Sequence, residues 1–327
     1  MARHLFLAMA AMVCWPIMAC AADNYGDNPS ARALIEELVT EQGFDRGNLE
    51  AVFANAERQE SILEAIARPA EKTKPWHEYR QIFLTEKRER EGREFFAAHR
   101  ETLARAEAET GVPAEIIVAI IGVETFYGRI TGSYRVIDAL STLAFDYPRR
   151  SAFFTKELKN YLLLTRDQGL DPLAMKGSYA GAMGYGQFMP SSYRSYAVDF
   201  DGDGFTDIWN NPEDAIGSVA NYFKRHGWRP GEQVVTAATL GGEVPDDWFN
   251  SGLKPARAAG EYLEAGLQPA MALDPAVAVT AMKFDGDEGF EYWLGLHNFY
   301  VITRYNHSAM YAMSVYQLSQ RLAGGRG

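Results

Sequence analysis

One glutamate has the sequence surroundings of an acid–base catalyst. Glu124 follows the apolar run Ile116 to Val123, and Gly128, a natural helix terminator, places it in the last turn of a helix buried on all sides. Apolar surroundings and the negative helix end both disfavour a carboxylate, and no Lys or Arg nearby in the sequence is bound to offset them. We therefore expect a raised pKa, which suits a general acid. The alternative is an ordinary exposed residue where a helix reaches water.

An acidic loop has the residue types of a calcium site. Asp199, Asp201 and Asp203 occupy positions 1, 3 and 5 of a calcium-binding pattern, and Gly204 supplies the sharp turn at position 6. The three carboxylates and the Phe205 carbonyl would be ligands. Because clustered carboxylates repel one another, we expect Ca²⁺ to stabilise the loop and to have no catalytic role.

Residues 177–189 combine glycines with Tyr, Met, Gln and Phe. Glycines allow close backbone approach to a ligand, and aromatic faces suit sugar rings, so this stretch predicts a substrate groove. A phosphate-binding loop fits poorly, because neither a Walker-type Lys-Ser/Thr nor a dinucleotide glycine pattern is present. For Phe188 and Met189, ordinary core packing is the alternative.

Composition and missing motifs exclude several classes of function. The formal charge of −11 argues against general nucleic-acid binding, which needs a basic surface. The histidines show no paired metal spacing, and no Gly-x-Ser-x-Gly elbow occurs, which disfavours a zinc peptidase and a serine hydrolase. We expect no organic cofactor and a monomeric protein.

The elements that would position these residues are mainly helical. Periodic apolar residues predict an N-terminal helical domain over 28–110, with helices over 31–39 and 49–67 and one long helix over 79–108. A catalytic core would follow over 111–229. Residues 230–289 contain β-like runs and turns, so we expect a small β-containing insertion there, with helices from residue 291 completing the core. The expected fold class is therefore mainly α (α+β).

Three motifs resemble those of the lytic murein transglycosylase B family, which has a goose-lysozyme-like catalytic core. They are residues 122–125 (GVET), 181–192 (GAMGYGQFMPSS) and 214–223 (DAIGSVANYF). The resemblance covers most of the chain after about residue 30 and is densest over 111–228. It implies a lysozyme-like helical core with an added N-terminal helical domain and an inserted β-containing domain.

The resemblance also implies a reaction on peptidoglycan. Glu124 would protonate the glycosidic oxygen between N-acetylmuramic acid and N-acetylglucosamine and then deprotonate the muramoyl C6 hydroxyl, giving a 1,6-anhydro product. Asp146 is another acid in a plausible motif, with a turn or capping role favoured over a nucleophilic one. A muramidase with the same fold and a non-catalytic wall-binding protein are the competing functions.

Further site residues follow from the same resemblance. Position 12 of the calcium loop is Asn210, and the family closes a longer loop (199–214) with a later acid, aligned here to Asp214 with Glu213 as the alternative. Arg149 and Arg150 would pair with carboxylates of the peptide stems, unless they are simply solvated. Asn306 would hold an acetamido group of the glycan or orient Glu124. The residues that the resemblance places around the glycan are Ser178, Gln187, Phe188, Met189, Tyr222, Tyr305, Asn306, Tyr311 and, more weakly, Tyr79.

The N-terminus has the pattern of an export signal. Arg3 and His4 precede an apolar stretch that ends at Cys20, which predicts a signal peptide over residues 1–21 and a periplasmic protein. Ala19-Cys20-Ala21 suits ordinary signal peptidase. Residues 17–20 also form a passable lipobox, which would give an outer-membrane lipid anchor at Cys20. Because Cys14 and Cys20 are the only cysteines, no disulfide can hold the mature fold.

Overall fold

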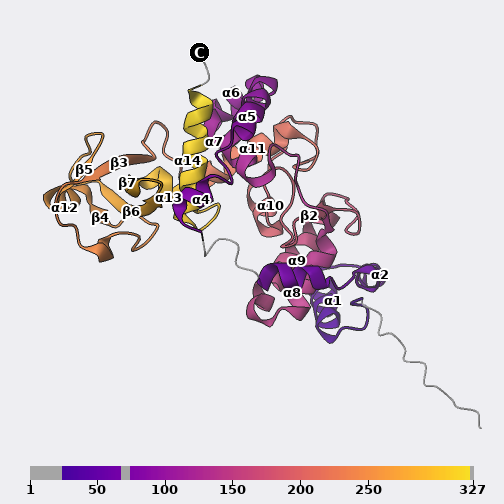
Figure 1. The fold of residues 1–327 in the computed structure, drawn as a ribbon. Helices are drawn as coiled ribbons and strands as arrows, with labels where there is room; N and C mark the ends of the chain where they lie inside the picture. Colours follow the sequence, from indigo (N-terminus) through magenta and orange to yellow (C-terminus); the bar gives the residue numbers. More distant parts are fainter. Residues whose placement is uncertain (1–23, 68–73, 325–327) are drawn as a thin grey trace, which may run out of the picture.

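The computed structural model describes residues 24–67 and 74–324, so the predicted signal peptide and Cys20 lie outside the described residues. The chain forms three parts: a helical body, a lower helical lobe and a β domain (Figure 1). The predicted mainly helical fold with a small β-containing part is confirmed. Within the described ranges, no helix has both the length and the apolar character needed to cross a membrane.

The helical body is built around one buried helix. Every residue of α7 (Ala114–Thr125) is buried except Glu115 and Glu124, which confirms the prediction of a helix apolar on all sides. It packs against α14 (Ala309–Ala323) and three other helices. The remaining helices of the helical body are α4 (Trp76–Arg80), α5 (Glu86–Ala98), α6 (Arg100–Thr110), α11 (Pro212–Arg225) and α13 (His297–Thr303).

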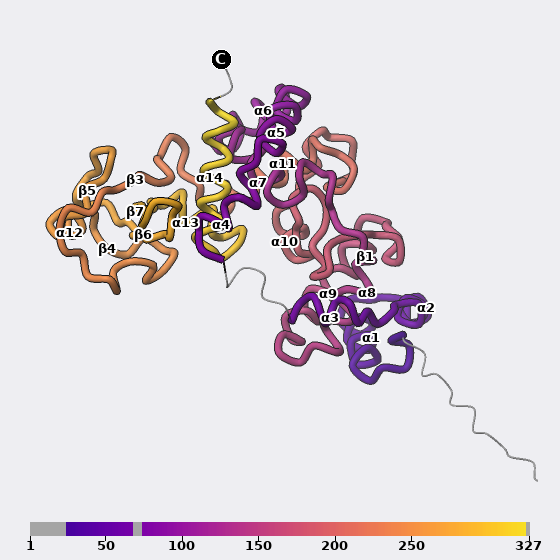
Figure 2. Tube along the Cα trace, viewed as in Figure 1, coloured from indigo at the N-terminus to yellow at the C-terminus, as the bar shows by residue number. Residues whose placement is uncertain are grey.

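The lower lobe brings the first helices of the chain onto later ones (Figure 2). The Asp138 carboxylate and the Thr142 hydroxyl accept hydrogen bonds from the backbone of Glu57 (2.9 Å) and Gln59 (3.0 Å). Residues 28–110 therefore contribute to two parts of the fold, and the domain boundaries stay predictions. The elements of the lower lobe are α1 (Pro29–Gln42), α2 (Arg46–Asn55), α3 (Glu60–Ala67), α8 (Val136–Asp146), η1 (Pro148–Arg150) and α9 (Ser151–Asp167), with α10 (Pro190–Tyr196) joining it to the helical body.

Two of the predicted helices are interrupted. The long helix over 79–108 was wrong: Thr85 caps α5, its hydroxyl accepting from the Arg88 N–H (3.2 Å), and His99 leaves helical geometry between α5 and α6. The segment 49–67 is also two helices, because the residues between α2 and α3 give their backbone N–H groups to side chains of α8. Tertiary hydrogen bonds replace helical ones at this break.

The β domain is a five-stranded antiparallel sheet in the order β4-β6-β7-β3-β5 with its own small apolar core. The helix predicted from residue 291 was wrong up to residue 295, because Trp293 pairs with Met282 on one side and Ala237 on the other. The elements are β3 (Val235–Leu240), η2 (Asp246–Trp248), β4 (Arg257–Ala258), α12 (Ala259–Glu264), β5 (Leu267–Pro269), β6 (Ala278–Gly286) and β7 (Gly289–Gly295). A separate pair, β1 (Tyr134–Arg135) and β2 (Lys176–Gly177), lies beside the groove loop.

Candidate active site

Helix α7 ends abruptly just after Glu124. The predicted position in the last turn is confirmed, but Gly128 does not end the helix: Phe126 (φ 53°) and Tyr127 (φ 61°) are already left-handed, as is Gly128 (φ 84°). Left-handed non-glycine residues cost roughly 1–2 kcal/mol each, and such strain concentrates at functional sites. Buried Thr125 secures the turn, donating its hydroxyl to the Tyr185 carbonyl (2.8 Å) and accepting from the Gly128 N–H (3.0 Å).

Tyr311 holds the Glu124 carboxylate. Ser308 caps α14 by accepting from the Tyr311 N–H (3.2 Å), which fixes Tyr311 in the first helical turn. The Tyr311 side chain is buried, and its hydroxyl donates to Oε1 of Glu124. Burial, followed by the charge of Glu124, raises the pKa of Tyr311 well above its usual value. The hydroxyl therefore keeps its proton and remains a donor to the carboxylate.

Two further tyrosines lie near this pair. Burial and the Glu124 charge also raise the pKa of Tyr305 well above its usual value. Tyr79, from α4, is buried and lies close enough to Tyr311 to contribute to the raised pKa of that residue. The structure thus brings together side chains from α4, α7 and α14 and from the turn between α13 and α14, which also carries Asn306.

Phe188, Tyr222 and Tyr305 form an aromatic cluster that packs next to the site. The ring of Phe188 lies 5.9 Å from that of Tyr222 and 6.1 Å from that of Tyr305. The Tyr222 hydroxyl donates to the Arg304 carbonyl (2.5 Å), and the Tyr305 hydroxyl donates to the Gly186 carbonyl (2.6 Å). Because Phe188 is only 3% exposed, its predicted place in the groove surface is corrected to packing beneath it. Met189 is partly exposed and packs against the core.

The glycine-rich loop is folded against the turn after α7. The Ser178 hydroxyl accepts from the Ala182 N–H (3.1 Å) and closes a turn within the loop. Gln187 is left-handed (φ 50°), and its amide donates to the carbonyls of Thr131 (3.1 Å) and Gly184 (3.0 Å). Its Oε1 is the acceptor that remains for a ligand.

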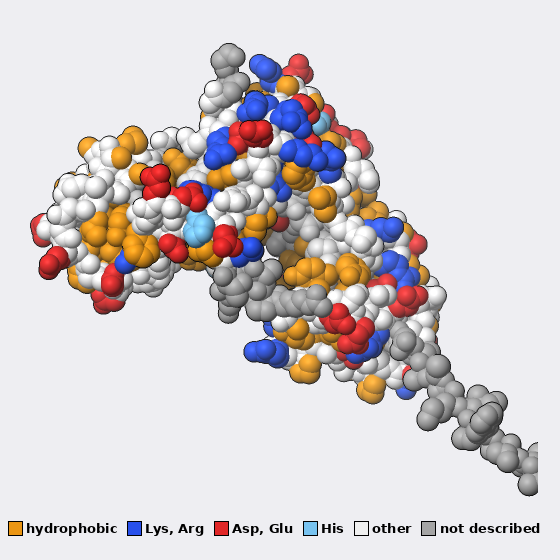
Figure 3. All heavy atoms as spheres, viewed as in Figure 1, with side chains coloured by type: hydrophobic (Ala, Val, Ile, Leu, Met, Phe, Trp, Pro, Cys, Tyr) orange, Lys and Arg blue, Asp and Glu red, His pale blue; other side chains and the backbone are white. Residues whose placement is uncertain are grey.

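Three charged residues singled out in the sequence lie in the lower lobe. Arg149 and Arg150 are exposed in η1, which packs on α8 and α9, and the guanidinium of Arg150 lies 4.5 Å from the Phe153 ring centre. Asp146 accepts from the Tyr25 hydroxyl (2.5 Å) and lies 3.6 Å from Arg58. The structure therefore ties Asp146 to the segment before α1 and to the link between α2 and α3, within the lower lobe. On the face shown in Figure 3, Lys and Arg gather instead over the helical body near α5 and α6.

Some residues that shape the site carried no obvious signal in the sequence. Arg88, which lies 36 positions before Glu124, donates its Nε to the Gly122 carbonyl (3.0 Å). A cation therefore does offset the end of α7, but it comes from a residue distant in sequence and not from the nearby residues that the prediction considered. Arg88 belongs to a run of alternating charges, residues 86–94, which looks like a solvated helix face. The one signal in that run is Gly92, an unusual residue for a helix interior.

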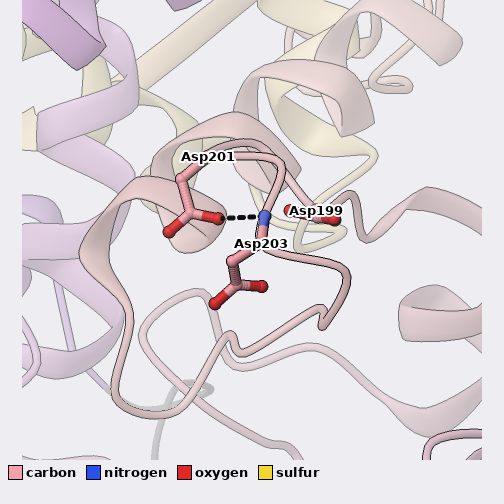
Figure 4. Close-up of side chains that lie close together, drawn as sticks. All are labelled: Asp199, Asp201 and Asp203. Atoms are coloured by element: carbon pink, nitrogen blue, oxygen red, sulfur yellow. Dashed lines mark hydrogen bonds between the residues drawn. The ribbon is translucent and has the colours of Figure 1, made fainter.

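The acidic loop gathers three carboxylates at the surface. Oxygen atoms of Asp199, Asp201 and Asp203 lie within 4.8 Å of one another (Figure 4). Backbone N–H groups of the loop hold these side chains: Asp199 accepts from Gly202 (2.7 Å) and Gly204 (2.8 Å). An all-oxygen set of this size suits a hard cation such as Ca²⁺, so the residues fit the ion expected from the sequence.

The predicted closing ligand, Asp214, is not one of the three gathered carboxylates. Asp214 is buried, and its two oxygens accept from the backbone N–H groups of Phe200 (2.6 Å) and Asp207 (2.7 Å). Burial raises the pKa of Asp214, although these two hydrogen bonds oppose the shift. Asp214 thus braces the loop from inside. Glu213, the alternative, lies 3.7 Å from Arg105.

Comparison with known proteins agrees with this geometry. Residues 26–320 match the family model of the transglycosylase SLT domain. The chain is 46% identical over 312 residues to membrane-bound lytic murein transglycosylase B of Escherichia coli K12, covering 93% of this chain and 85% of that protein.

Solved structures show the same fold. SltB1 of Pseudomonas aeruginosa, a soluble lytic transglycosylase solved in a catenated form, has a TM-score of 0.90 and 56% identity, covering 93% of this chain and all of that one. Slt35 of E. coli in complex with calcium has a TM-score of 0.86 and 45% identity, covering 93% of this chain and 96% of that one. SltB3 of P. aeruginosa, in complex with NAG-anhNAM-pentapeptide, has a TM-score of 0.79 and 32% identity (90% and 79% covered). A family model and a relative that each span most of the chain settle the assignment: the protein belongs to the lytic murein transglycosylases with a transglycosylase SLT domain.

Proposed function

We propose that Glu124 is the catalytic residue of this peptidoglycan lytic transglycosylase and acts first as an acid and then as a base. It would donate a proton to the glycosidic oxygen between N-acetylmuramic acid and N-acetylglucosamine as that β-1,4 bond breaks. The resulting carboxylate would then remove the proton of the muramoyl C6 hydroxyl as O6 bonds to C1. The products are a 1,6-anhydromuramoyl end and a free 4-hydroxyl, and no water is consumed.

The observation that carries this proposal is the hydrogen bond from Tyr311 to Glu124. A buried hydroxyl that stays protonated donates to Oε1 and so fixes the carboxyl group that would exchange a proton with the substrate. Mechanisms with two carboxylates need them roughly 5–10 Å apart across the sugar. Asp146 instead bonds to Tyr25 in the lower lobe, which favours a single acid that serves twice.

The glycan would lie along the loop of residues 177–189. Gln187 would accept a hydrogen bond through its amide oxygen, and Ser178, Met189 and Asn306 are partly exposed. Tyr79, Tyr222, Tyr305 and Phe188 would act by supporting this surface. A strand that continued onto the lower lobe would bring its peptide stems to Arg149 and Arg150, whose guanidiniums suit stem carboxylates. The complex of SltB3 with a pentapeptide-bearing disaccharide supports peptidoglycan as the ligand.

The substitution Glu124→Gln tests the catalytic role. We expect it to slow the clearing of purified sacculi by at least roughly 100-fold, the effect of removing a general acid. Glu115→Gln, at the opposite end of the same helix, is the matched control and should leave the rate unchanged. Mass spectrometry of the digest should show muropeptides lighter by one water than reducing-end products. Reducing-end products would indicate a muramidase instead, and activity that survives Glu124→Gln would remove the proposed mechanism.

We infer that the loop of residues 199–214 binds a structural Ca²⁺ ion. Asp199, Asp201 and Asp203 would supply carboxylates and Phe205 its carbonyl, with Asp214 or Glu213 closing the set. Support comes from the three gathered carboxylates and from the calcium complex of Slt35. The ion would neutralise the repulsion among these acids. A melting temperature that does not change between calcium and chelator would remove the site.

We propose that the mature enzyme works as a monomer in the periplasm. The N-terminal pattern supports export, and the E. coli relative is named membrane-bound. Cleavage after Ala21 by ordinary signal peptidase and lipid attachment at Cys20 are distinguished by the mass of the mature N-terminus. A diacylglyceryl adduct on Cys20 would establish an outer-membrane anchor, and an unmodified N-terminus would exclude it.

A further inference from the structure

A buried arginine of α5 lies against the end of α7. Arg88 is 9% exposed, and its guanidinium donates to the carbonyls of Gly122 (3.0 Å) and Ile82. No carboxylate lies within 4 Å of it among residues 24–67 and 74–324. Burial lowers the pKa of Arg88, which shows that the surroundings disfavour its charge. A buried cation is costly, so its contacts need a reason beyond filling space.

The contacts of Arg88 lie on both sides of Glu124 in the sequence. Two residues before the acid, the Gly122 carbonyl accepts from Nε. Two residues after it, the Phe126 ring lies 4.6 Å from the guanidinium carbon, a cation–π contact. Three residues after it, the Tyr127 hydroxyl donates to the backbone carbonyl of Arg88 (2.8 Å). One residue therefore contacts the last helical turn and both strained left-handed residues.

Two glycines make room for this arrangement. A Cβ on Gly122 would lie 2.6 Å from the Tyr127 ring, and a Cβ on Gly92 would lie 2.3 Å from the Tyr127 hydroxyl. Real Cβ atoms do not approach so closely, so both helices need glycine where the tyrosine passes between them. Left-handed geometry is unfavourable for the non-glycine residues Phe126 and Tyr127. Contacts that exist only with the turn in this form must offset that cost.

The positive charge also complements the helix end. The last carbonyls of a helix carry about half a negative charge, so a partly buried cation there is stabilising. Lys87 and Arg129 also lie near the Phe126 ring, at 5.4 and 5.7 Å, but both are exposed and Arg129 pairs with Glu91. Arg88 is thus the buried cation that bonds to the backbone of α7.

We propose that Arg88 is a positioning residue for the reaction: it clamps the left-handed turn after α7 and thereby fixes the direction of the Glu124 side chain. The inference rests on the proposed role of Glu124 and adds a residue that does not touch the substrate. Its guanidinium fork suits two carbonyls and a ring face at once, which the single point charge of a lysine cannot match. Arg88 fixes the conformation of the turn at the end of α7, and Tyr311 fixes the orientation of the Glu124 carboxyl group.

The test compares Arg88→Met and Arg88→Lys with Arg166→Met. Arg166 is a matched control, because it also bonds to a backbone carbonyl (Gln42, 2.7 Å) and lies over a ring (Phe44, 4.4 Å), but in the lower lobe. We expect Arg88→Met to lower kcat for anhydro-product release by roughly 10- to 100-fold, with KM within about twofold, the size of effect that a displaced catalytic group gives. Arg88→Lys should recover part of this loss, and Arg166→Met should leave kcat unchanged.

Hydrogen exchange separates positioning from a general loss of stability. The amides of Phe126, Tyr127 and Gly128 should exchange at least about tenfold faster in Arg88→Met, while the core of α7 stays protected. If Arg88→Met does not fold, the same measurements are made on Arg88→Lys. Unchanged exchange at these three amides, or kcat within twofold of wild type in both Arg88 variants, would overturn the proposal. If Glu124→Gln keeps full activity, the proposed function fails instead, and the exchange data alone decide whether Arg88 clamps the turn.

Discussion

Removing the Tyr311 hydroxyl is the sharpest test of how the acid is held. The substitution Tyr311→Phe keeps the buried ring and deletes only the donor to Glu124 Oε1. A hydrogen bond to a charged group contributes about 1.5–3 kcal/mol, and each 1.36 kcal/mol is a factor of ten in rate. Because the hydroxyl contacts the acid and is too buried to bind the glycan, the loss should appear in kcat. We expect a decrease of roughly 10- to 150-fold with little change in KM.

The assay is single-turnover release of anhydro muropeptides from sacculi, with mass detection of the products. Tyr161→Phe is the matched control, since Tyr161 is a fully buried tyrosine whose hydroxyl donates to the Pro172 carbonyl (2.7 Å) in the lower lobe. It should lose about 1 kcal/mol of stability and keep its kcat. If Tyr311→Phe turns over within twofold of wild type while remaining folded, Tyr311 does not orient the acid. A rise in KM alone would also refute the argument, because it would assign the hydroxyl to substrate binding.

Three further predictions address packing, pH and metal. Gly122→Ala should destabilise the fold by about 1–3 kcal/mol, because its Cβ would lie 2.6 Å from the Tyr127 ring. The control Gly47→Ala should be neutral or stabilising, because its Cβ would meet only a side-chain oxygen at 3.4 Å. Equal melting temperatures of the two variants would contradict this prediction. Buried Tyr311 and partly buried Tyr305 have raised pKa values, so the unfolded chain loses their protons first. Stability should therefore fall as pH rises above about 10, and denaturant midpoints that stay flat to pH 11 would exclude this. Asp203→Asn should abolish the calcium-dependent rise in melting temperature and leave kcat in calcium-free buffer unchanged. If the rise persists in this variant, the ion binds at another site.

Sequence patterns within short segments predicted those parts of the site that are formed by residues close together in the chain. The apolar run before Glu124 predicted a buried helix, and the spacing of Asp199, Asp201 and Asp203 predicted carboxylates that the structure gathers within 4.8 Å. The breaks at residues 56–59 and at His99 escaped prediction, because tertiary hydrogen bonds or local backbone geometry decide them. Strand β7 escaped for a similar reason, since its pairing with two strands overrides a pattern that also suits a helix.

What sequence could not predict is which distant residues meet at the acid. Arg88 stands among alternating charges that look solvated, and Thr125 belongs to the motif 122–125 but gives no sign of its partner Tyr185. Their roles depend on where α5 and the loop at Tyr185 pack, and one-dimensional spacing carries no information on that. Phe188 illustrates the converse: an aromatic residue in a binding motif turned out to be 3% exposed and to support its neighbours.

The position of Glu124 opposes the electrostatics of its own helix. A helix buried on all sides can present a side chain to substrate only at its ends, and α7 carries one glutamate near each end. Glu115 occupies the first turn, where the helix dipole favours an anion, while Glu124 occupies the last turn, where the dipole disfavours one. A carboxylate chosen for stability would belong at the first position. Placing the second one at the wrong end requires a cation and a donor from elsewhere in the chain, and Arg88 and Tyr311 are those two groups. This conflict with local rules is what the proposed catalytic role of Glu124 predicts, because a carboxyl group selected for reactivity need not lie where folding favours it.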